Sequence, residues 1–521
     1  MCLFTSYGFI ALVIGLLSYT FFLFIMKPSV CRHGKALRRP PDTLPVIGNG
    51  LVFLQSRKKV FSWFVKSEHI FGLETFFISV PTLPPGVVIH DPKNLDFVFK
   101  NESLFAKGNF FREKVYDLFG EGIINVDSDS WKVQRKAGLK FLSAANLGNL
   151  TDVALPQYLA QTVRELERKE GAVVDLDDAF HELTTQIMGR MAYNVDMHHS
   201  DRFSAAFDFA SAFTAARFQN PLWRVSELFS ARHFRAAMKE VKLFGANLVS
   251  STKRSRELGQ QNGEGGKRTK LEPGSLINSL LDSIEDERIV AEAALCYLSA
   301  GKDTTGQALS WTFYLLMKNP EALQNARRAV SKFLSDTERA ESLDPCFDSA
   351  IFRPTALPYI MAVFYESLRF FPPVPFELKE CQQPTTLPDG TFLPKNTIVC
   401  WCTWAMNRSH LRWSGDVDKF KPERWMENGI FVQRSASEFP VFNGGSRMCL
   451  GKTMAEIIAT QVIATLIMTF DFELLEDEEK GYRDSLTLPL EGGLSCRVVR
   501  ISKDRVGLGM GVSGMNNKGP N

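Results

Sequence analysis

A single cysteine stands in a glycine-rich stretch of the chain, FPVFNGGSRMCLGKTMA at residues 439–455. Cys449 follows Arg447 closely and precedes an apolar segment with helical character. A helix N-terminus and a nearby guanidinium both favour thiolate over thiol. Such a thiolate could ligate a metal or act as a nucleophile, and Gly444 and Gly445 would let backbone approach a flat ligand. No local signature supplies a nucleophile's histidine partner, and on local composition alone a plain buried cysteine is the commoner case.

An acid and an alcohol are adjacent in Ala-Gly-Lys-Asp-Thr-Thr, residues 300–305, within a run that predicts one long helix. The glycine followed by hydroxyls would let that helix deform, because a hydroxyl can bond an interrupted backbone ladder. An acid next to an alcohol can supply protons through a water chain. The alternative is a poor helix interior, in which glycine costs ~1 kcal/mol relative to alanine.

Further pairs have helical spacing. Glu366 and Arg369 are three residues apart, Trp131 and Arg135 are four apart, and either spacing puts both side chains on one helix face. Arg424 lies in the run FKPERW. Each feature is weak alone, since an exposed charge pair of this spacing contributes only ~0.2–0.5 kcal/mol and recurs by chance. A plain surface helix would also explain Trp131 and Arg135.

The elements that must position these residues are mainly helices. Helices are predicted at 155–170, 175–195, 202–218, 230–252, 285–317, 357–370 and after Cys449. Short β-branched runs predict strands at 75–80, 87–89 and within 385–405. The polar, glycine-containing segment 251–275 is typical of a mobile surface loop. No linker divides the body, so we expect a single domain that is mainly α with a minor β portion.

The composition indicates a folded chain and argues against nucleic-acid binding. Of the 521 residues, 45% are hydrophobic and 23% are charged, which is ordinary for a folded protein. A net charge of +3 gives no basic footprint for nucleic acid. The 42 phenylalanines suit a protein that handles lipophilic ligands, or simply fill a core. In the Phe-rich stretch 201–218, a packed amphipathic helix and a ligand-contacting helix are equally good interpretations.

The first 26 residues carry no charge and are long enough to span a bilayer core of ~30 Å as a helix. They lack the positive start and cleavage site of a signal peptide, and five basic residues follow between 27 and 39. That bias leaves the rest of the chain on the cytoplasmic side. We expect a single-pass anchor in the endoplasmic reticulum membrane at 1–26, a basic, Pro-rich connector at 27–50, the main domain at 51–500 and a flexible tail at 501–521. A buried globular N-terminal helix is the alternative.

Together these motifs resemble the cytochrome P450 superfamily. The pattern F-x-x-G-x-R-x-C-x-G at residues 442–451 resembles the family's haem-binding loop, and the other motifs occur in the family's order. The resemblance covers residues 1 to about 500. It implies the single-domain cytochrome P450 fold, haem b as the cofactor and monooxygenase activity.

The resemblance also implies a role for each motif residue. Cys449 would be the axial thiolate ligand of the haem iron. The residues implied to contact the haem are Arg447, Trp131, Arg135 and Phe442. Asp303 and Thr304 would deliver protons during catalysis. The residues implied to form a buried structural network are Glu366, Arg369 and Arg424.

Longer stretches, among them GEGIINVDSDSWKVQRK at 120–136 and TLPDGTFLPKNTIV at 386–399, resemble the plant and fungal fatty-acid ω-hydroxylase branch. This resemblance implies oxidation of an unactivated, terminal C–H of a long-chain fatty acid, in one or more rounds. Two departures from the branch pattern are Lys302, where arginine is common, and the lack of a proline before Arg447. These departures favour a diverged member of the branch. For such a member, the alternative to a fatty acid is a fungal secondary metabolite, such as a polyketide or terpenoid.

No dinucleotide-binding motif is visible, so electrons would come from a separate NADPH–cytochrome reductase, with cytochrome b5 as an optional second donor. The expected small-molecule partners are O2 and a lipophilic substrate. The alternative function is a haem protein that binds lipid or gas without turnover. Asp303 and Thr304 argue against it, because binding alone needs no proton relay.

Overall fold

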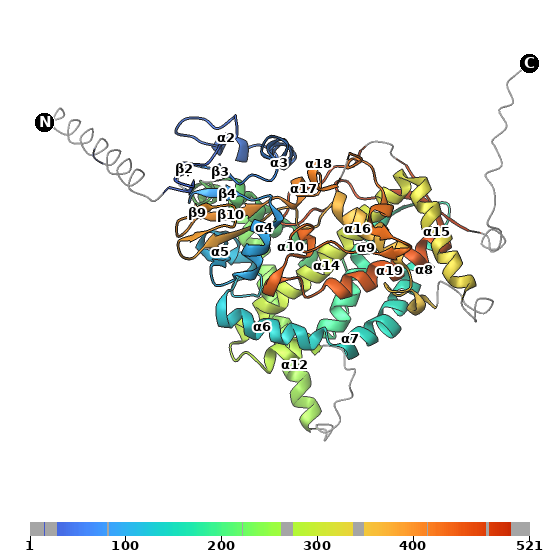
Figure 1. Cartoon of the computed structure of the whole chain (residues 1–521). Helices are drawn as coiled ribbons and strands as arrows, with labels where there is room; N and C mark the ends of the chain where they lie inside the picture. Colours follow the sequence, from blue (N-terminus) through green and yellow to red (C-terminus); the bar gives the residue numbers. More distant parts are fainter. Residues whose placement is uncertain are drawn as a thin grey trace, which may run out of the picture.

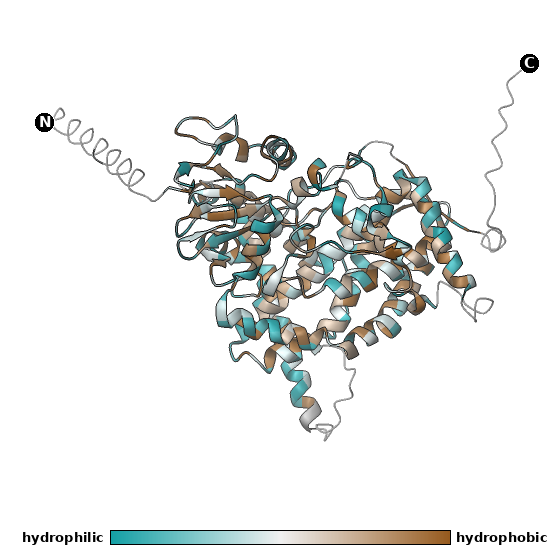
Figure 2. Cartoon of the chain, viewed as in Figure 1, coloured by the Kyte–Doolittle hydropathy of each residue, from teal (hydrophilic) through white to brown (hydrophobic). Residues whose placement is uncertain are grey.

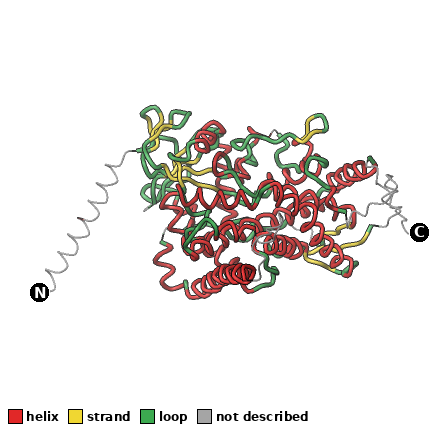
Figure 3. Tube along the Cα trace, turned by 90° about the horizontal axis from the view of Figure 1, so that it is seen from below, coloured by secondary structure: helices red, strands yellow, loops and turns green. Residues whose placement is uncertain are grey.

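The computed structural model describes residues 29–80, 83–220, 222–261, 275–336, 348–413, 415–475 and 479–501, together with Gly15. Helices make up most of the body, and the strands lie towards its margins (Figures 1 and 3). Hydrophilic residues follow the outer parts of α12 and α15 (Figure 2). The expectation of a mainly α domain with a minor β portion is therefore confirmed.

The α-helices of the described residues are α2 (Gly50–Phe53), α3 (Arg57–Phe71), α4 (Pro92–Lys100), α5 (Gly108–Phe119), α6 (Ser128–Phe141), α7 (Ala144–Asn149), α8 (Leu155–Arg168), α9 (Leu176–Met188), α10 (Arg202–Gln219), α11 (Trp223–Ser230), α12 (Arg232–Gln261), α13 (Ser275–Leu281), α14 (Glu287–Lys318), α15 (Pro320–Ser335), α16 (Pro358–Phe370), α17 (Thr403–Met406), α18 (His410–Trp413) and α19 (Lys452–Thr469).

Helix α14 runs through the middle of the body and packs against α9, α12, α16 and α19 (Figure 1). Asp286 caps its N-terminus, because the side chain accepts a hydrogen bond from the backbone N–H of Arg288. The helix ends at Lys318, and only Asn319 separates it from the proline that begins α15. Most of its residues are buried, as expected for a helix with neighbours on several sides.

The strands form four small sheets. The largest has the order β3 (Phe76–Ile78), β4 (Gly86–Val88), β10 (Ile398–Trp401), β7 (Glu377–Cys381) and β5 (Phe105–Ala106), in which only the β4–β10 pair is parallel. The remaining sheets are β2 (Lys35–Ala36), β1 (Cys31–Arg32), β9 (Thr391–Leu393) and β8 (Thr385–Thr386); β13 (Phe470–Leu474), β14 (Ser495–Arg500) and β6 (Val173–Asp175); and β11 (Met426–Glu427) with β12 (Ile430–Phe431).

Two segments differ from the sequence-based expectations. The predicted loop at 251–275 is wrong in its first part, because α12 continues as a helix to Gln261; residues 262–274 lie outside the described residues. Strands β1 and β2 occur within the predicted connector and were not anticipated. Both strands join the sheet formed with β9, so the chain is part of the folded body from Cys31 onward.

The predicted membrane anchor at 1–26 lies outside the described residues apart from Gly15, and the predicted tail does so beyond Ile501. Within the ranges that the structure describes, no helix combines the length and the apolar character needed to cross a membrane.

Candidate active site

A cavity of about 580 Å³ lies beside the middle of α14 and extends from the Cys449 loop to α3. Its walls are largely apolar. The phenylalanines that line it are Phe53, Phe61, Phe64, Phe110, Phe111, Phe119, Phe141, Phe207, Phe218, Phe364, Phe376 and Phe442. Such an apolar cavity with a few convergent polar groups is what a small-molecule site requires.

The Phe-rich helix α10 is both a packed amphipathic helix and a ligand-contacting helix, the two interpretations that its sequence allowed. Phe207 and Phe218 line the cavity. Phe203 instead stacks on Phe244 of α12, with ring centroids 4.1 Å apart, and Phe213 stacks on Phe234 at 4.5 Å. The helix is therefore at once a packed core element and a wall of the ligand site.

Cys449 opens into this cavity three residues before α19 begins. Its backbone N–H donates to the carbonyl oxygen of Phe442 at 2.8 Å, which closes the loop. Cys400 also lines the cavity, but it is buried in β10 and its Sγ lies 3.2 Å from the Val87 carbonyl oxygen. Of the described cysteines that border the cavity, Cys449 alone is exposed to it, as a metal ligand must be.

The electrostatics of Cys449 differ from the sequence-based expectation. Burial raises the pKa of its thiol above the ordinary value, although the backbone N–H groups of Gly451 and Lys452 and the charge of Arg135 act in the opposite direction. The protein alone therefore does not hold a free thiolate at neutral pH. A bound metal cation deprotonates a coordinating thiol, so this cysteine suits a metal ligand better than a free nucleophile.

The glycines of the loop make room for a protein side chain. Gly445 has φ of +61°, and a Cβ there would lie 2.0 Å from the carbonyl oxygen of Phe99. A Cβ on Gly444 would lie 2.3 Å from the Phe99 ring. The space expected for a flat ligand at these two positions is filled by Phe99, so the glycines dock the loop onto α4.

Arg447, Trp131 and Arg135 all line the cavity next to this loop. The Arg447 guanidinium lies 4.1 Å from the centroid of the Trp131 ring and the Arg135 guanidinium 5.4 Å from it. Arg135 also donates to the Met448 carbonyl oxygen at 3.0 Å. The structure thus brings Arg447 next to Trp131 and Arg135, which lie 316 and 312 positions earlier in the sequence.

The donors of Arg447 are already engaged by the protein. Its Nε donates to Glu102 at 2.7 Å, Nη2 to Asp127 at 2.8 Å and Nη1 to the Val126 carbonyl oxygen at 3.0 Å. Two carboxylates therefore neutralise this guanidinium. Its observed contacts tie the Cys449 loop to the segments before α5 and α6.

Asp303 and Thr304 both border the cavity from α14, but their side chains make separate contacts. Thr304 Oγ1 donates to the Ala300 carbonyl oxygen at 2.6 Å, whereas Asp303 Oδ1 lies 2.5 Å from Lys302 Nζ. Burial would lower the pKa of Lys302, but the carboxylates of Asp303 and Asp208 raise it on balance. The buried lysine therefore stays charged and holds the carboxylate of Asp303.

The predicted deformation of α14 at Gly301 does not occur, because the helix is continuous through this position. A Cβ on Gly301 would lie 2.5 Å from Met188 Sδ. The glycine instead lets α14 pack closely against α9.

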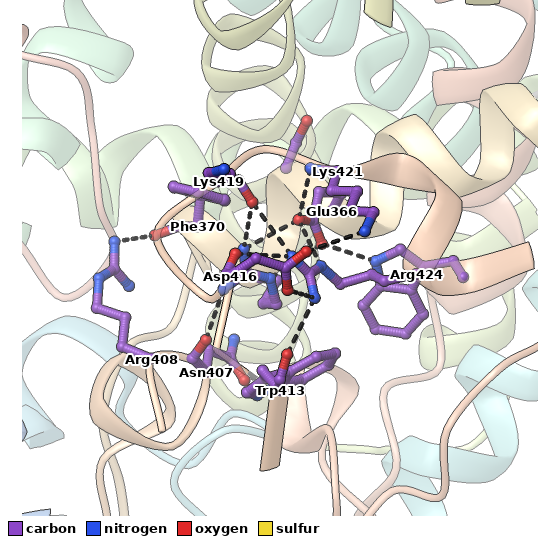
Figure 4. Close-up of polar contacts among 12 residues, drawn as sticks. Glu366, Phe370, Asn407, Arg408, Trp413, Asp416, Lys419, Lys421 and Arg424 are labelled. Atoms are coloured by element: carbon purple, nitrogen blue, oxygen red, sulfur yellow. Dashed lines mark hydrogen bonds and ion pairs between the residues drawn. The ribbon is translucent and has the colours of Figure 1, made fainter. Parts of the chain in front are cut away.

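Glu366, Arg369 and Arg424 form a buried network between α16 and the turn at Pro422–Trp425. Figure 4 shows the polar contacts around Glu366 and Arg424. Arg369 donates to both carboxylate oxygens of Glu366 at 2.9 Å, and Arg424 Nε donates to Glu366 Oε1 at 2.8 Å. Trp425 Nε1 and the Lys421 backbone N–H also donate to Glu366, each at 2.9 Å. The carboxylate is thus fully satisfied, which the spacing of Glu366 and Arg369 alone could not establish.

This combination of a cavity-facing cysteine, an acid and alcohol on a central helix and a buried Glu–Arg–Arg network agrees with the family comparison. The family model described as Cytochrome P450 matches residues 39–494. The chain belongs to the cytochrome P450 family. It is a monooxygenase of the haem-thiolate type, in which a cysteine binds iron protoporphyrin IX.

Relatives of this cytochrome P450 occur in plants and fungi. Cytochrome P450 94A1 of Vicia sativa is 28% identical over 483 residues, which cover 88% of this chain and 90% of the relative. Cytochrome P450 86B1 of Arabidopsis thaliana is 29% identical over 437 residues, covering 80% and 77%. Cytochrome P450 monooxygenase cyp1 of Mycosarcoma maydis is 27% identical over 502 residues, covering 88% and 76%.

The cytochrome P450 site also contains a cation that the sequence patterns did not reveal. Lys379 on β7 is 3% exposed and lines the cavity, and its Nζ has no ion pair or hydrogen bond within the described residues. Burial lowers its pKa to about 7, and the nearby cations Lys107 and Arg447 add to this shift. An unpartnered amino group in such a place needs an anion.

The residues present fit haem b. This cofactor carries two carboxylates on one edge of a flat apolar ring, and the cavity offers a thiol, apolar walls and the cations Lys379 and Arg135. Lys107 is less available to pair with a haem carboxylate, since Glu377 lies 3.3 Å from its Nζ. Lys379 could not be found from sequence because a single lysine in the strand ELKEC shows no distinctive spacing.

Proposed function

We propose that this cytochrome P450 inserts one oxygen atom from O2 into the terminal C–H of a long-chain fatty acid. The observation that carries the proposal is the phenylalanine-lined cavity, which reaches from Cys449 and Thr304 to the N-terminal half of α3. An aliphatic chain would bury apolar surface against these walls. The sequence resemblance to the ω-hydroxylase branch supports the same substrate class.

Within this proposal, each motif residue has a defined task. Cys449 would ligate the iron, and haem bound in this way supplies the oxidising power for C–H cleavage. Thr304 would donate protons at its Oγ1, and Asp303 would resupply them after turning from Lys302. Trp131, Arg135 and Phe442 would contact the cofactor, and Arg447 would hold the loop beside it.

A substrate panel tests the proposal. Full-length protein with an NADPH-dependent reductase is supplied with saturated fatty acids of increasing length, and the products are separated by mass spectrometry. Terminal hydroxy acids or dicarboxylic acids are expected. If the haem is intact and no fatty acid is oxidised, the proposal fails and a secondary metabolite such as a polyketide or terpenoid becomes the substrate class to test.

We further propose that residues 1–26 anchor the protein in the endoplasmic reticulum membrane with the enzyme domain in the cytoplasm. Apolar residues exposed near the start of the folded body support this proposal. The region of α2 and the end of α10 lie side by side there, because Gln219 Nε2 lies 3.4 Å from the Gln55 carbonyl oxygen. The large apolar side chains exposed around α2 are Leu44, Val46, Ile47, Leu51 and Leu54, and those exposed at α11, which follows α10, are Leu222, Val225, Leu228 and Phe229. Removal of residues 1–26 is expected to release the protein from microsomes at high salt.

For the electron donor, we propose an NADPH–cytochrome reductase that docks over α6. This helix presents Lys132, Lys136 and Lys140 on its exposed side, while Trp131 and Arg135 line the cavity. A row of cations favours an acidic partner surface and salt-sensitive association. Substitution of the three lysines by glutamine is expected to slow electron transfer most at low ionic strength.

A further inference from the structure

Arg57 is a cavity-lining cation that stands apart from the others. Four cations line the cavity near the Cys449 loop and β7, namely Lys107, Arg135, Lys379 and Arg447. Arg57 instead lies at the first position of α3, and its electrostatic neighbours are Asp484, Tyr482 and Cys402. The charge of Arg57 therefore belongs to a different part of the cavity wall from the group that suits the cofactor carboxylates.

The guanidinium of Arg57 is only partly used by the protein. Its Nη1 donates to the carbonyl oxygens of Ser485 and Thr487, the latter at 2.9 Å, and its Cζ lies 5.1 Å from the centroid of the Phe61 ring. No carboxylate of the described residues lies within 4 Å of it, and its Nε and Nη2 have no acceptor there. Two donors of the planar fork are thus available for a ligand.

The surroundings make this a favourable place for an anion. Burial lowers the pKa of Arg57 to about 10, with the charge of Asp484 acting in the opposite direction, so the guanidinium remains protonated at neutral pH. Ser485 is buried, whereas Asp484 is exposed, which places Arg57 where the cavity wall approaches solvent. The walls beside it are apolar, formed by Val60, Phe61, Phe64 and Leu486.

We infer that Arg57 binds the carboxylate of an aliphatic acid and thereby directs the opposite, methyl end of the chain towards Cys449 and Thr304. The inference rests on the proposed function and extends it, because it gives a reason for oxidation at the terminal carbon. The forked guanidinium matches a carboxylate geometrically, and a charge-assisted hydrogen bond in an apolar wall is strong. A neutral head group would gain neither contribution.

The experiment compares a charged with a neutral ligand of the same chain length. Binding of dodecanoic acid and of 1-dodecanol to the full-length, haem-loaded protein is measured by calorimetry for the wild type and Arg57→Gln. The acid's Kd is expected to rise about tenfold or more in the variant, because the charge-assisted hydrogen bonds to the guanidinium are lost. The alcohol's Kd should change by less than about twofold, since the aliphatic contacts remain.

Lys58→Gln is the matched control, because Lys58 is the next residue of α3, is exposed and does not line the cavity. It should leave both affinities unchanged. Equal weakening of acid and alcohol in Arg57→Gln would mean that Arg57 only shapes the wall, and this would overturn the inference, as would an unchanged affinity for the acid. In either case, oxidation of the acid by the wild type would leave the proposed function standing. If the wild type neither binds nor oxidises the acid, both proposals fall.

Discussion

Lys302 Nζ lies 2.5 Å from Asp303 Oδ1, and the lysine side chain is completely buried. The pair lies between the cavity, which Asp303 lines, and α9, where Thr184 Oγ1 donates to the Lys302 carbonyl oxygen at 2.9 Å. Asp208 of α10 contributes a second negative charge nearby. Lys302, which stands where arginine is common in the fatty-acid ω-hydroxylase branch, is therefore the counter-ion of Asp303, the predicted proton donor.

Replacing Lys302 by methionine is expected to destabilise the protein, because it leaves the carboxylate of Asp303 buried and unpaired. Breaking a buried pair in this way costs about 3–5 kcal/mol. Urea denaturation of Lys302→Met should show this loss, whereas Lys302→Arg, which keeps the charge, should retain most of the stability. A loss below about 1 kcal/mol in Lys302→Met would contradict the assigned pairing.

Thr304→Ala tests the proton-donor role. Without the Oγ1 hydroxyl, a roughly tenfold lower yield of product per NADPH is expected from the loss of a positioned proton donor. The ratio is measured from NADPH consumption and product in the same reaction.

Thr312→Ala is the control for that variant. Thr312 also lies on α14 and donates to the carbonyl oxygen four residues earlier, at 2.7 Å, but it is fully buried and does not line the cavity. It should preserve the product yield per NADPH. Equal yields in Thr304→Ala and the wild type would remove Thr304 from the relay.

Substitutions in the Glu366 network should rank by how much charge they leave unpaired. Glu366→Gln leaves Arg369 buried without its anion and is expected to cost about 3–5 kcal/mol of unfolding free energy. Trp425→Phe removes one hydrogen bond and should cost only about 1–3 kcal/mol. The unfolding free energies of the two variants are measured by chemical denaturation. A larger loss in Trp425→Phe than in Glu366→Gln would contradict this account.

His90 gives the protein a pH-dependent stability. Burial lowers its pKa from 6.5 to about 3, and the charge of Arg412 adds to the shift. Above pH 6.5 the ring is neutral in both states, but below it only the unfolded chain takes the proton, so stability falls. This group should contribute a loss of about 2 kcal/mol between pH 6.5 and pH 5. The slope of unfolding free energy against pH in this window should be shallower in His90→Asn; an unchanged slope would contradict the assignment.

The sequence predicted the elements that carry strong periodicity or sharp boundaries. The long helix expected at 285–317 occurs as α14, because Asp286 caps it and a proline follows its end. The helix after Cys449 and the helix that carries Glu366 and Arg369 were likewise predicted from apolar runs and flanking prolines.

The errors arose where tertiary contacts outweigh local composition. The polar end of α12 resembles a loop, yet Arg256 donates to both the side chain and the backbone oxygen of Asn278, at 2.7 and 2.8 Å. These contacts with α13 hold a helix that propensity alone would not predict. Lys379 and Arg57 were missed for a related reason: a single cation shows no spacing pattern until the fold buries it against the cavity.

The most direct test of the account is the position and origin of the oxygen atom in the product. The full-length protein, an NADPH-dependent reductase and hexadecanoic acid are incubated under 18O2, and the products are fragmented by mass spectrometry. We predict one 18O atom on the carbon farthest from the carboxylate. Label at in-chain carbons, or an oxygen derived from water, would contradict terminal monooxygenation.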